Sequence, residues 1–214
     1  MLFMIVTILS AAALFWGLSW YEYKGLNQAE PGENRGYFSW LFSKKIRFES
    51  FKEGKKKGLE FYNRWFVKAY PIKQRWIFVC LAVSFLYLVL SGFIFALFLP
   101  GRIRGIPLML HMIAGGVFAA SLGAAVILRV RYYGFWDINR PSTRSELDQV
   151  LVRISFWVFV LSGFFSILSA LSMMMPYFSV AGQIQLFTLH QYSALAAVLA
   201  AFAFIYLTPD DKLR

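Results

Sequence analysis

The chain has 214 residues, of which 59% are hydrophobic and 19% aromatic, and it carries a formal net charge of +11. This composition excludes a soluble globular domain of this size and indicates membrane spans. The single cysteine, Cys80, excludes an intrachain disulfide and any cysteine-based iron–sulfur or zinc site within the chain.

Five apolar stretches are long enough to cross a bilayer as helices, which takes about 20 residues. They are Leu2–Trp20, Trp76–Leu99, Pro107–Leu128, Val152–Met175 and Ile184–Leu207. The first has no basic residues before it and no small-x-small cleavage site, which favours an anchor over a signal peptide. The predicted fold class is therefore an all-α integral membrane protein, with a four-helix transmembrane bundle and one extra N-terminal transmembrane helix.

Basic residues are concentrated in two connections. Between Tyr21 and Arg75 there are 13 Lys/Arg against 6 Asp/Glu, and the Leu128–Arg153 connection adds five arginines. The positive-inside rule places both connections in the cytoplasm, with the N-terminus outside and the C-terminus inside. Topology and anionic lipid headgroups explain the basic excess better than a nucleic-acid partner does.

Three regions follow from these patterns: an anchor over 1–20, a basic aromatic cytoplasmic linker over 21–72 and a four-helix bundle over 73–214. Within the linker, residues 38–70 mix aromatic residues with lysines. This composition predicts an amphipathic helix at the membrane interface, and the alternative is a solvated loop.

A pentapeptide occurs twice in the bundle, as Val89–Phe93 and Val160–Phe164, each with the sequence VLSGF. Each copy precedes a proline and then a Leu-His pair that contains His111 or His190, the only histidines. The two histidine-bearing spans run in the same direction, so we expect both imidazoles at one depth in the outer half of the membrane. A polar imidazole inside a span needs a partner. Two at matched depth can supply both axial ligands of one haem b iron.

Small residues are expected to leave room for a porphyrin. Gly92 and Gly163 are predicted at nearly the depth of the histidines, and Gly115 about one turn further inward. The alternative is that these glycines only pack helices closely. Arg102 and Arg104 lie in the connection beside the ligand layer, where a guanidinium can pair with a haem propionate or with lipid headgroups.

Residues from about 71 to 207 resemble the cytochrome b (gamma) subunit of respiratory formate dehydrogenase and the related b cytochromes of NiFe hydrogenases. The matching residues are Ser91-Gly92, Leu110-His111 with Gly115-Gly116, Gly163, Pro176-Tyr177-Phe178, and Leu189-His190 with Ala194. The resemblance implies an anchor in the bacterial inner membrane that passes electrons between a periplasmic redox subunit and exchangeable membrane quinone. That subunit is expected to be an iron–sulfur protein or a multihaem cytochrome. The resemblance also implies that His111 and His190 ligate the periplasmic-side haem.

The family's second, cytoplasmic-side haem is expected to be absent. Arg75 and Phe204 stand where the resemblance would require its two histidines. One haem b is therefore expected, with quinone reacting near it, or else in a retained site beside Arg75, Trp76 and Arg129. The predicted role is an electron-transfer subunit rather than a stand-alone enzyme. The alternative is a haem-free structural or assembly subunit.

Overall fold

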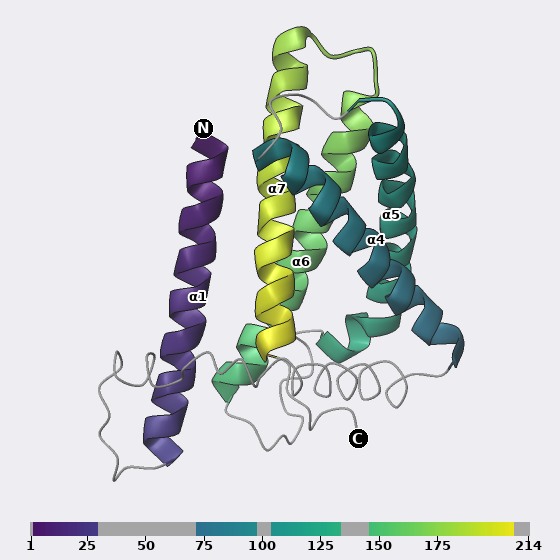
Figure 1. Ribbon diagram of the computed structural model, residues 1–214. Coiled ribbons are helices and arrows are strands. Elements are labelled where there is room, and N and C mark those ends of the chain that lie inside the picture. Colours follow the sequence, from purple (N-terminus) through teal and green to yellow (C-terminus); the bar gives the residue numbers. More distant parts are fainter. Residues whose placement is uncertain (1, 30–71, 98–103, 134–145, 208–214) are drawn as a thin grey trace. The chain divides into compact units, whose positions relative to one another are not determined.

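A computed structural model describes residues 2–29, 72–97, 104–133 and 146–207 (Figure 1). All regular structure in these residues is helical: α1 (Leu2–Ala29), α4 (Ile72–Leu97), α5 (Ile106–Tyr133), α6 (Glu146–Met173) and α7 (Val180–Leu207). Each of the five helices is long and apolar enough to cross a membrane. The chain is thus a multi-pass membrane protein, as the composition predicted, and its direction of insertion stays a prediction.

The helix bounds differ from the predicted spans in two informative places. The helix α1 continues nine residues beyond Trp20, so the expected linker begins as helix. The helix α7 begins at Val180, four residues before the predicted start at Ile184. The interfacial helix expected over 38–70 lies outside the described residues.

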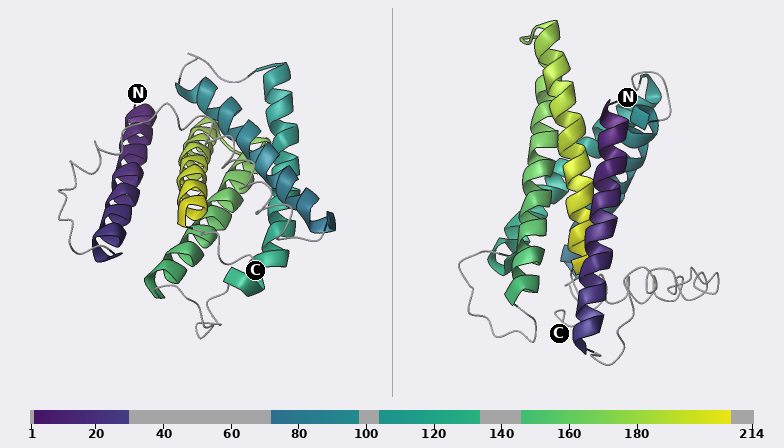
Figure 2. Two further views of the ribbon diagram at one scale, coloured as in Figure 1. Left: turned by 60° about the horizontal axis from the view of Figure 1, so that its bottom comes forward. Right: turned by 90° about the vertical axis from the view of Figure 1, so that its left-hand side faces the viewer.

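The four helices α4–α7 belong to one compact unit, whereas most of α1 belongs to a second. Within the bundle, α5 and α7 begin at the same end, and α4 and α6 run in the opposite direction (Figures 1 and 2). The helix α4 packs on α5, α6 packs on α7, and α5 packs on α6. The bundle therefore consists of two hairpins that are joined through α5 and α6.

Short local signals start the two histidine-bearing helices. Gly105 has a φ of 61°, a left-handed conformation that favours glycine, and its carbonyl accepts a hydrogen bond from Met109 N at 3.1 Å. Ser179 caps α7, because Gly182 N donates to its hydroxyl at 3.3 Å and Gln183 N donates to its carbonyl at 2.9 Å. This serine cap explains why α7 begins earlier than its apolar stretch.

Every buried polar residue in the described part of the chain is a serine. Their hydroxyls typically donate to the carbonyl four residues earlier: Ser84 to Cys80 at 2.6 Å, Ser121 to Val117 at 2.7 Å and Ser162 to Val158 at 2.6 Å. A bilayer offers no water, so each polar group needs an internal partner. These serines meet that need within their own helix and keep the surface small for close helix packing.

Phenylalanine rings fill the middle of the bundle. The Phe85 ring of α4 stacks on Phe118 of α5 at 5.7 Å, and Phe159 of α6 meets Phe85 edge-on at 5.3 Å and Phe118 at 6.4 Å. We call these three residues the central phenylalanine cluster. Such ring pairs add about 0.5–1.5 kcal/mol each beyond area burial. The cluster ties α4, α5 and α6 together at one level.

A second apolar cluster lies between the beginning of α6 and the end of α7. Val152 and Phe156 are buried there, and the Phe204 ring lies 6.0 Å from the Phe156 ring. Trp157, Val160 and Leu207 pack around them. We call this group the far cluster, because it lies toward the end of the bundle opposite the starts of α5 and α7.

Candidate functional site

His111 is held by Ser91 of the neighbouring helix. The Ser91 hydroxyl lies 2.8 Å from His111 Nδ1 and 2.7 Å from the Tyr87 carbonyl oxygen. Two oxygen atoms at 2.7 Å need a proton between them, so the hydroxyl donates to the carbonyl. The Ser91 oxygen then accepts from His111 Nδ1–H. This arrangement fixes the tautomer in which Nε2 of His111 carries only a lone pair.

His190 is held in the same tautomer by a different set of groups on α6. Its Nδ1 lies 3.0 Å from the Ser166 carbonyl oxygen and 3.3 Å from the Ser169 hydroxyl. A carbonyl can only accept, so Nδ1 carries the proton. The Ser169 hydroxyl donates to the same Ser166 carbonyl at 2.9 Å. Ser169 is only 1% exposed, so this support is deep in the helix interface.

Contacts along α6 give the relative levels of the two histidines in the bundle. His190 lies beside Ser166 and Ser169, whereas Gly163 lies against Phe118 of the antiparallel α5. His111 lies seven residues before Phe118 on α5. Because the two helices are antiparallel, His111 is level with the α6 position about seven residues after Gly163, next to Ser169. The two imidazoles therefore lie at nearly the same level, in agreement with the expected matched depth.

The Nε2 atoms of His111 and His190 differ from the Nδ1 atoms in their hydrogen bonding. No described group forms a hydrogen bond with Nε2 of either histidine. A Cβ placed on Gly92 would lie 3.6 Å from His111 Cε1, and one on Gly115 would meet no described atom within 4 Å. Two neutral imidazole lone pairs with small neighbours suit the axial ligation of a haem iron.

Gly163 has neighbours different from those of Gly92. Its nearest non-local atoms belong to Leu122 and Phe118, at 3.0 and 3.4 Å from an ideal Cβ. It lies three residues, about 4.5 Å along α6, before Ser166, whose carbonyl bonds His190, and about seven residues from the α6 position level with His111. The two VLSGF copies are not equivalent because α6 runs ten residues past Gly163, whereas α4 runs only five past Gly92. Figure 1 shows the start of α7 extending beyond the neighbouring ends of α4, α5 and α6.

Arg104 is exposed just before α5, and Arg102 lies outside the described residues, so a pairing with propionate stays a prediction for both. Phe204, which replaces an expected second-haem histidine, packs on Phe156 in the far cluster. At the other replaced position, Arg75 lies near the start of α4. The described residues contain no group of three or more His, Cys, Asp or Glu that could hold a metal ion.

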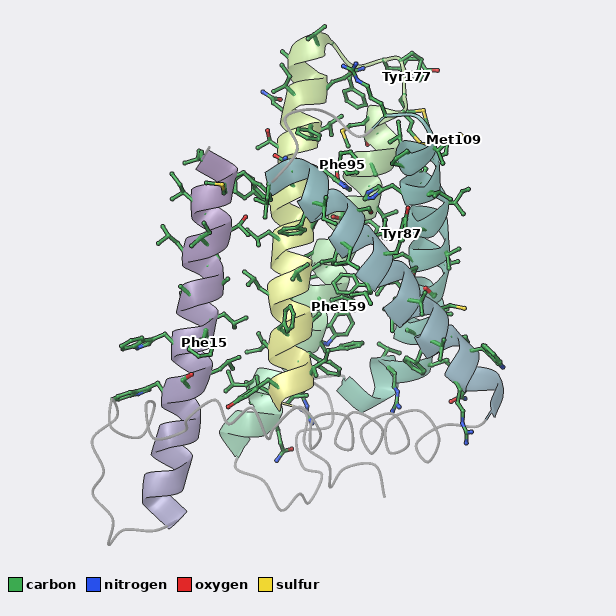
Figure 3. All side chains as sticks on the ribbon, in the orientation of Figure 1. Phe15, Tyr87, Phe95, Met109, Phe159 and Tyr177 are labelled. Atoms are coloured by element: carbon green, nitrogen blue, oxygen red, sulfur yellow. The ribbon has the colours of Figure 1, made fainter. Side chains whose placement is uncertain are left out.

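The sequence analysis missed the serines that orient His190. Ser166, Ser169 and Ser193 surround it, with Ser166 and Ser193 hydroxyls 3.0 Å apart and Ser193 donating to the His190 carbonyl at 3.1 Å. The sequence contains a pattern that could have revealed these serines. Ser162, Ser166 and Ser169 are spaced four and three residues apart, which places them on one helix face. Figure 3 shows Met109 and Tyr177 at the end where α5 and α7 begin, and Phe159 further along the bundle. Comparison with models of protein families, with curated proteins and with solved structures finds no match.

Proposed function

We propose that this protein is a single-haem b-type cytochrome and the membrane anchor of a quinone-linked respiratory oxidoreductase in the bacterial inner membrane. One observation carries the proposal: two imidazoles at similar levels, on helices that run in the same direction, have Nδ1 hydrogen-bonded and Nε2 without a hydrogen-bond partner among the described residues. Bis-imidazole coordination of haem iron needs this arrangement of nitrogen atoms. The resemblance to the formate dehydrogenase cytochrome b subunit supports the same function.

In this function, His111 and His190 would hold the iron, and the haem would supply a centre that gains and loses one electron. Ser91 and the Ser166 carbonyl fix the direction in which each Nε2 lone pair points. The apolar helix surfaces around the site exclude water. Electrons would pass between a periplasmic iron–sulfur or multihaem cytochrome subunit and the quinone pool.

The direct test is a pyridine haemochrome assay with a reduced-minus-oxidised spectrum on the purified full-length chain. We expect one haem b per chain. Two haems would contradict the single-site part of the proposal. No haem would reject the proposal and favour the alternative, a structural subunit, in which the serine–histidine bonds only tie α4 to α5 and α6 to α7.

Replacement of Ser91 by alanine is expected to change the haem without removing it. The His111 Nδ1–H would lose its acceptor, and the imidazole would become a weaker donor to the iron. Loss of such a supporting hydrogen bond typically lowers affinity for the bound group by about 10- to 100-fold. A weaker donor also favours ferrous over ferric iron, so the reduction potential should rise. Haem titration and a redox titration measure both effects.

The matched control for Ser91→Ala is Ser162→Ala, the same position in the second VLSGF copy. The Ser162 hydroxyl donates to the carbonyls of its own helix, at 2.6 Å to Val158. It forms no hydrogen bond with His190, whose partners among the described residues are Ser166 and Ser169. We expect a wild-type affinity and potential in Ser162→Ala. Equal changes in both variants would contradict the role assigned to Ser91.

A further inference from the structure

The histidine pair lies near one end of the bundle. His111 is five residues after the start of α5 at Ile106, and His190 is ten residues after the start of α7 at Val180. At 1.5 Å per residue, these positions are about 8 Å and 15 Å from the beginnings of their helices. The opposite ends of the two spans, Val130 and Leu207, lie about 28 Å and 25 Å beyond the histidines. We call the near end the histidine end.

Hydrocarbon side chains fill the bundle between the histidines and the opposite end. The central phenylalanine cluster begins seven residues beyond His111, with Phe118. The far cluster follows, with Phe156 and Phe204 in ring contact. The serines at these levels, Ser84, Ser121 and Ser162, bond to carbonyls of their own helices. This stretch spans most of a hydrocarbon core that is about 30 Å thick.

No second redox centre can be ligated by histidine in this stretch, since the chain has only two histidines. Phenyl and aliphatic groups offer no metal ligand, and their low dielectric makes transfer of charge across them costly. The Phe204 ring packs on Phe156 at a position where the resemblance would require a histidine ligand of a second haem.

We propose that electrons enter and leave the haem only at the histidine end, so that the electron donor and the electron acceptor both react at one face of the membrane. The proposal rests on the proposed function and makes it more specific. It assigns the quinone to the histidine end and excludes the alternative site beside Arg75 and Arg129, at the opposite end. The packed phenylalanines act as an insulator in place of a second haem.

The electron balance at this end is simple. A quinol that is oxidised to a quinone gives up two electrons and two protons. A haem held by His111 and His190 would supply a one-electron centre, so the two electrons would pass singly to the acceptor subunit. The two protons go to water at the same face. Reduction of a quinone follows the reverse course, and in neither direction does charge cross the membrane.

The test uses the full-length, haem-loaded chain in sealed liposomes, with ferric haem and random insertion. Dithionite, which is charged and does not cross the bilayer, is added outside, and the reduced-haem spectrum is recorded before and after detergent. The share of chains with the C-terminus outside is measured by protease removal of a C-terminal tag. Ferricyanide trapped in parallel vesicles that contain no protein reports any leak, because entering dithionite would bleach it.

Because α7 ends opposite the histidine end, chains with a protease-protected tag have their histidine end outside. We expect the haem reduced before detergent to equal the protected fraction, with the remainder reduced only after detergent. Reduction of all the haem before detergent, under conditions in which the protein-free vesicles show no leak, would overturn one-ended exchange and leave the proposed function intact. A chain that binds no haem would overturn both.

A second readout locates the iron without any electron transfer. Ile106 and Ile127 are 72% and 77% exposed on α5, five and sixteen residues from His111. In a Cys80→Ser background, nitroxide labels are attached to Ile106→Cys or Ile127→Cys. Ferric haem should shorten the relaxation time of the first label strongly and that of the second weakly, because the labels lie about 8 Å and 24 Å along the helix from His111. Equal effects would overturn placement of the iron at the histidine end.

Discussion

His190→Ala alone is expected to reduce the haem content of the purified protein to a small fraction of the wild-type value, and so is His111→Ala. A bis-imidazole site needs both Nε2 lone pairs, and the chain has no third histidine to replace either one. Any residual haem should be five-coordinate and high-spin, without the sharp reduced bands of the wild-type protein. Haem stoichiometry and the reduced absorption spectrum measure the two effects.

The control for His190→Ala is Thr188→Ala on the same helix. Thr188 is exposed, and its hydroxyl donates to the Ile184 carbonyl at 2.9 Å, so its loss should leave haem binding unchanged. Size-exclusion chromatography in detergent separates lost ligation from lost folding. Loss of an interhelical hydrogen bond in a membrane bundle costs only about 1 kcal/mol, so both histidine variants should remain folded. A normal six-coordinate spectrum in either variant would refute the ligand assignment.

Length, apolar runs and charge were enough to predict the helices, because each span is a continuous apolar stretch with few competing signals. The prediction located all five candidate spans and placed His111 and His190 at one level. The start of α7 was less accurate, since hydropathy finds the apolar stretch but not the serine cap at Ser179 that lengthens the helix. The order of the helices around the bundle depends on side-chain packing, which a single sequence does not show.

The repeated VLSGF motif does not give its two glycines the same neighbours. Identical residues in the two copies suggested equivalent places, but Gly92 lies beside His111 whereas Gly163 lies against Leu122 and Phe118. In the second hairpin α7 begins ten residues before its histidine, whereas α5 begins five residues before His111, and the support for His190 comes from Ser166 and Ser169, further along α6. A repeat in sequence fixes residue types, and the helix lengths around it decide what those residues contact.

Gly163→Leu is expected to destabilise the bundle and to weaken haem binding together. An ideal Cβ at Gly163 already lies 3.0 Å from Leu122 Cδ2 and 3.4 Å from Phe118 Cζ. Leu122 and Phe118 are buried, and Phe118 is also held by two rings of the central phenylalanine cluster, so neither can move away easily. Overpacking of this kind typically costs about 1–3 kcal/mol. A lower unfolding temperature in detergent measures the loss.

The effect on haem follows from the place of Gly163 in the bundle. The α4–α5 hairpin holds His111, the α6–α7 hairpin holds His190, and the α5–α6 contact joins the two. A leucine at Gly163 pushes α6 away from α5 and so changes the separation of the two Nε2 atoms, although Gly163 itself touches neither histidine. The matched control is Gly123→Leu on α5, where an added Cβ would meet no described atom within 4 Å. Wild-type haem affinity in Gly163→Leu, together with a lowered unfolding temperature, would show that the α5–α6 contact stabilises the fold without setting the histidine separation.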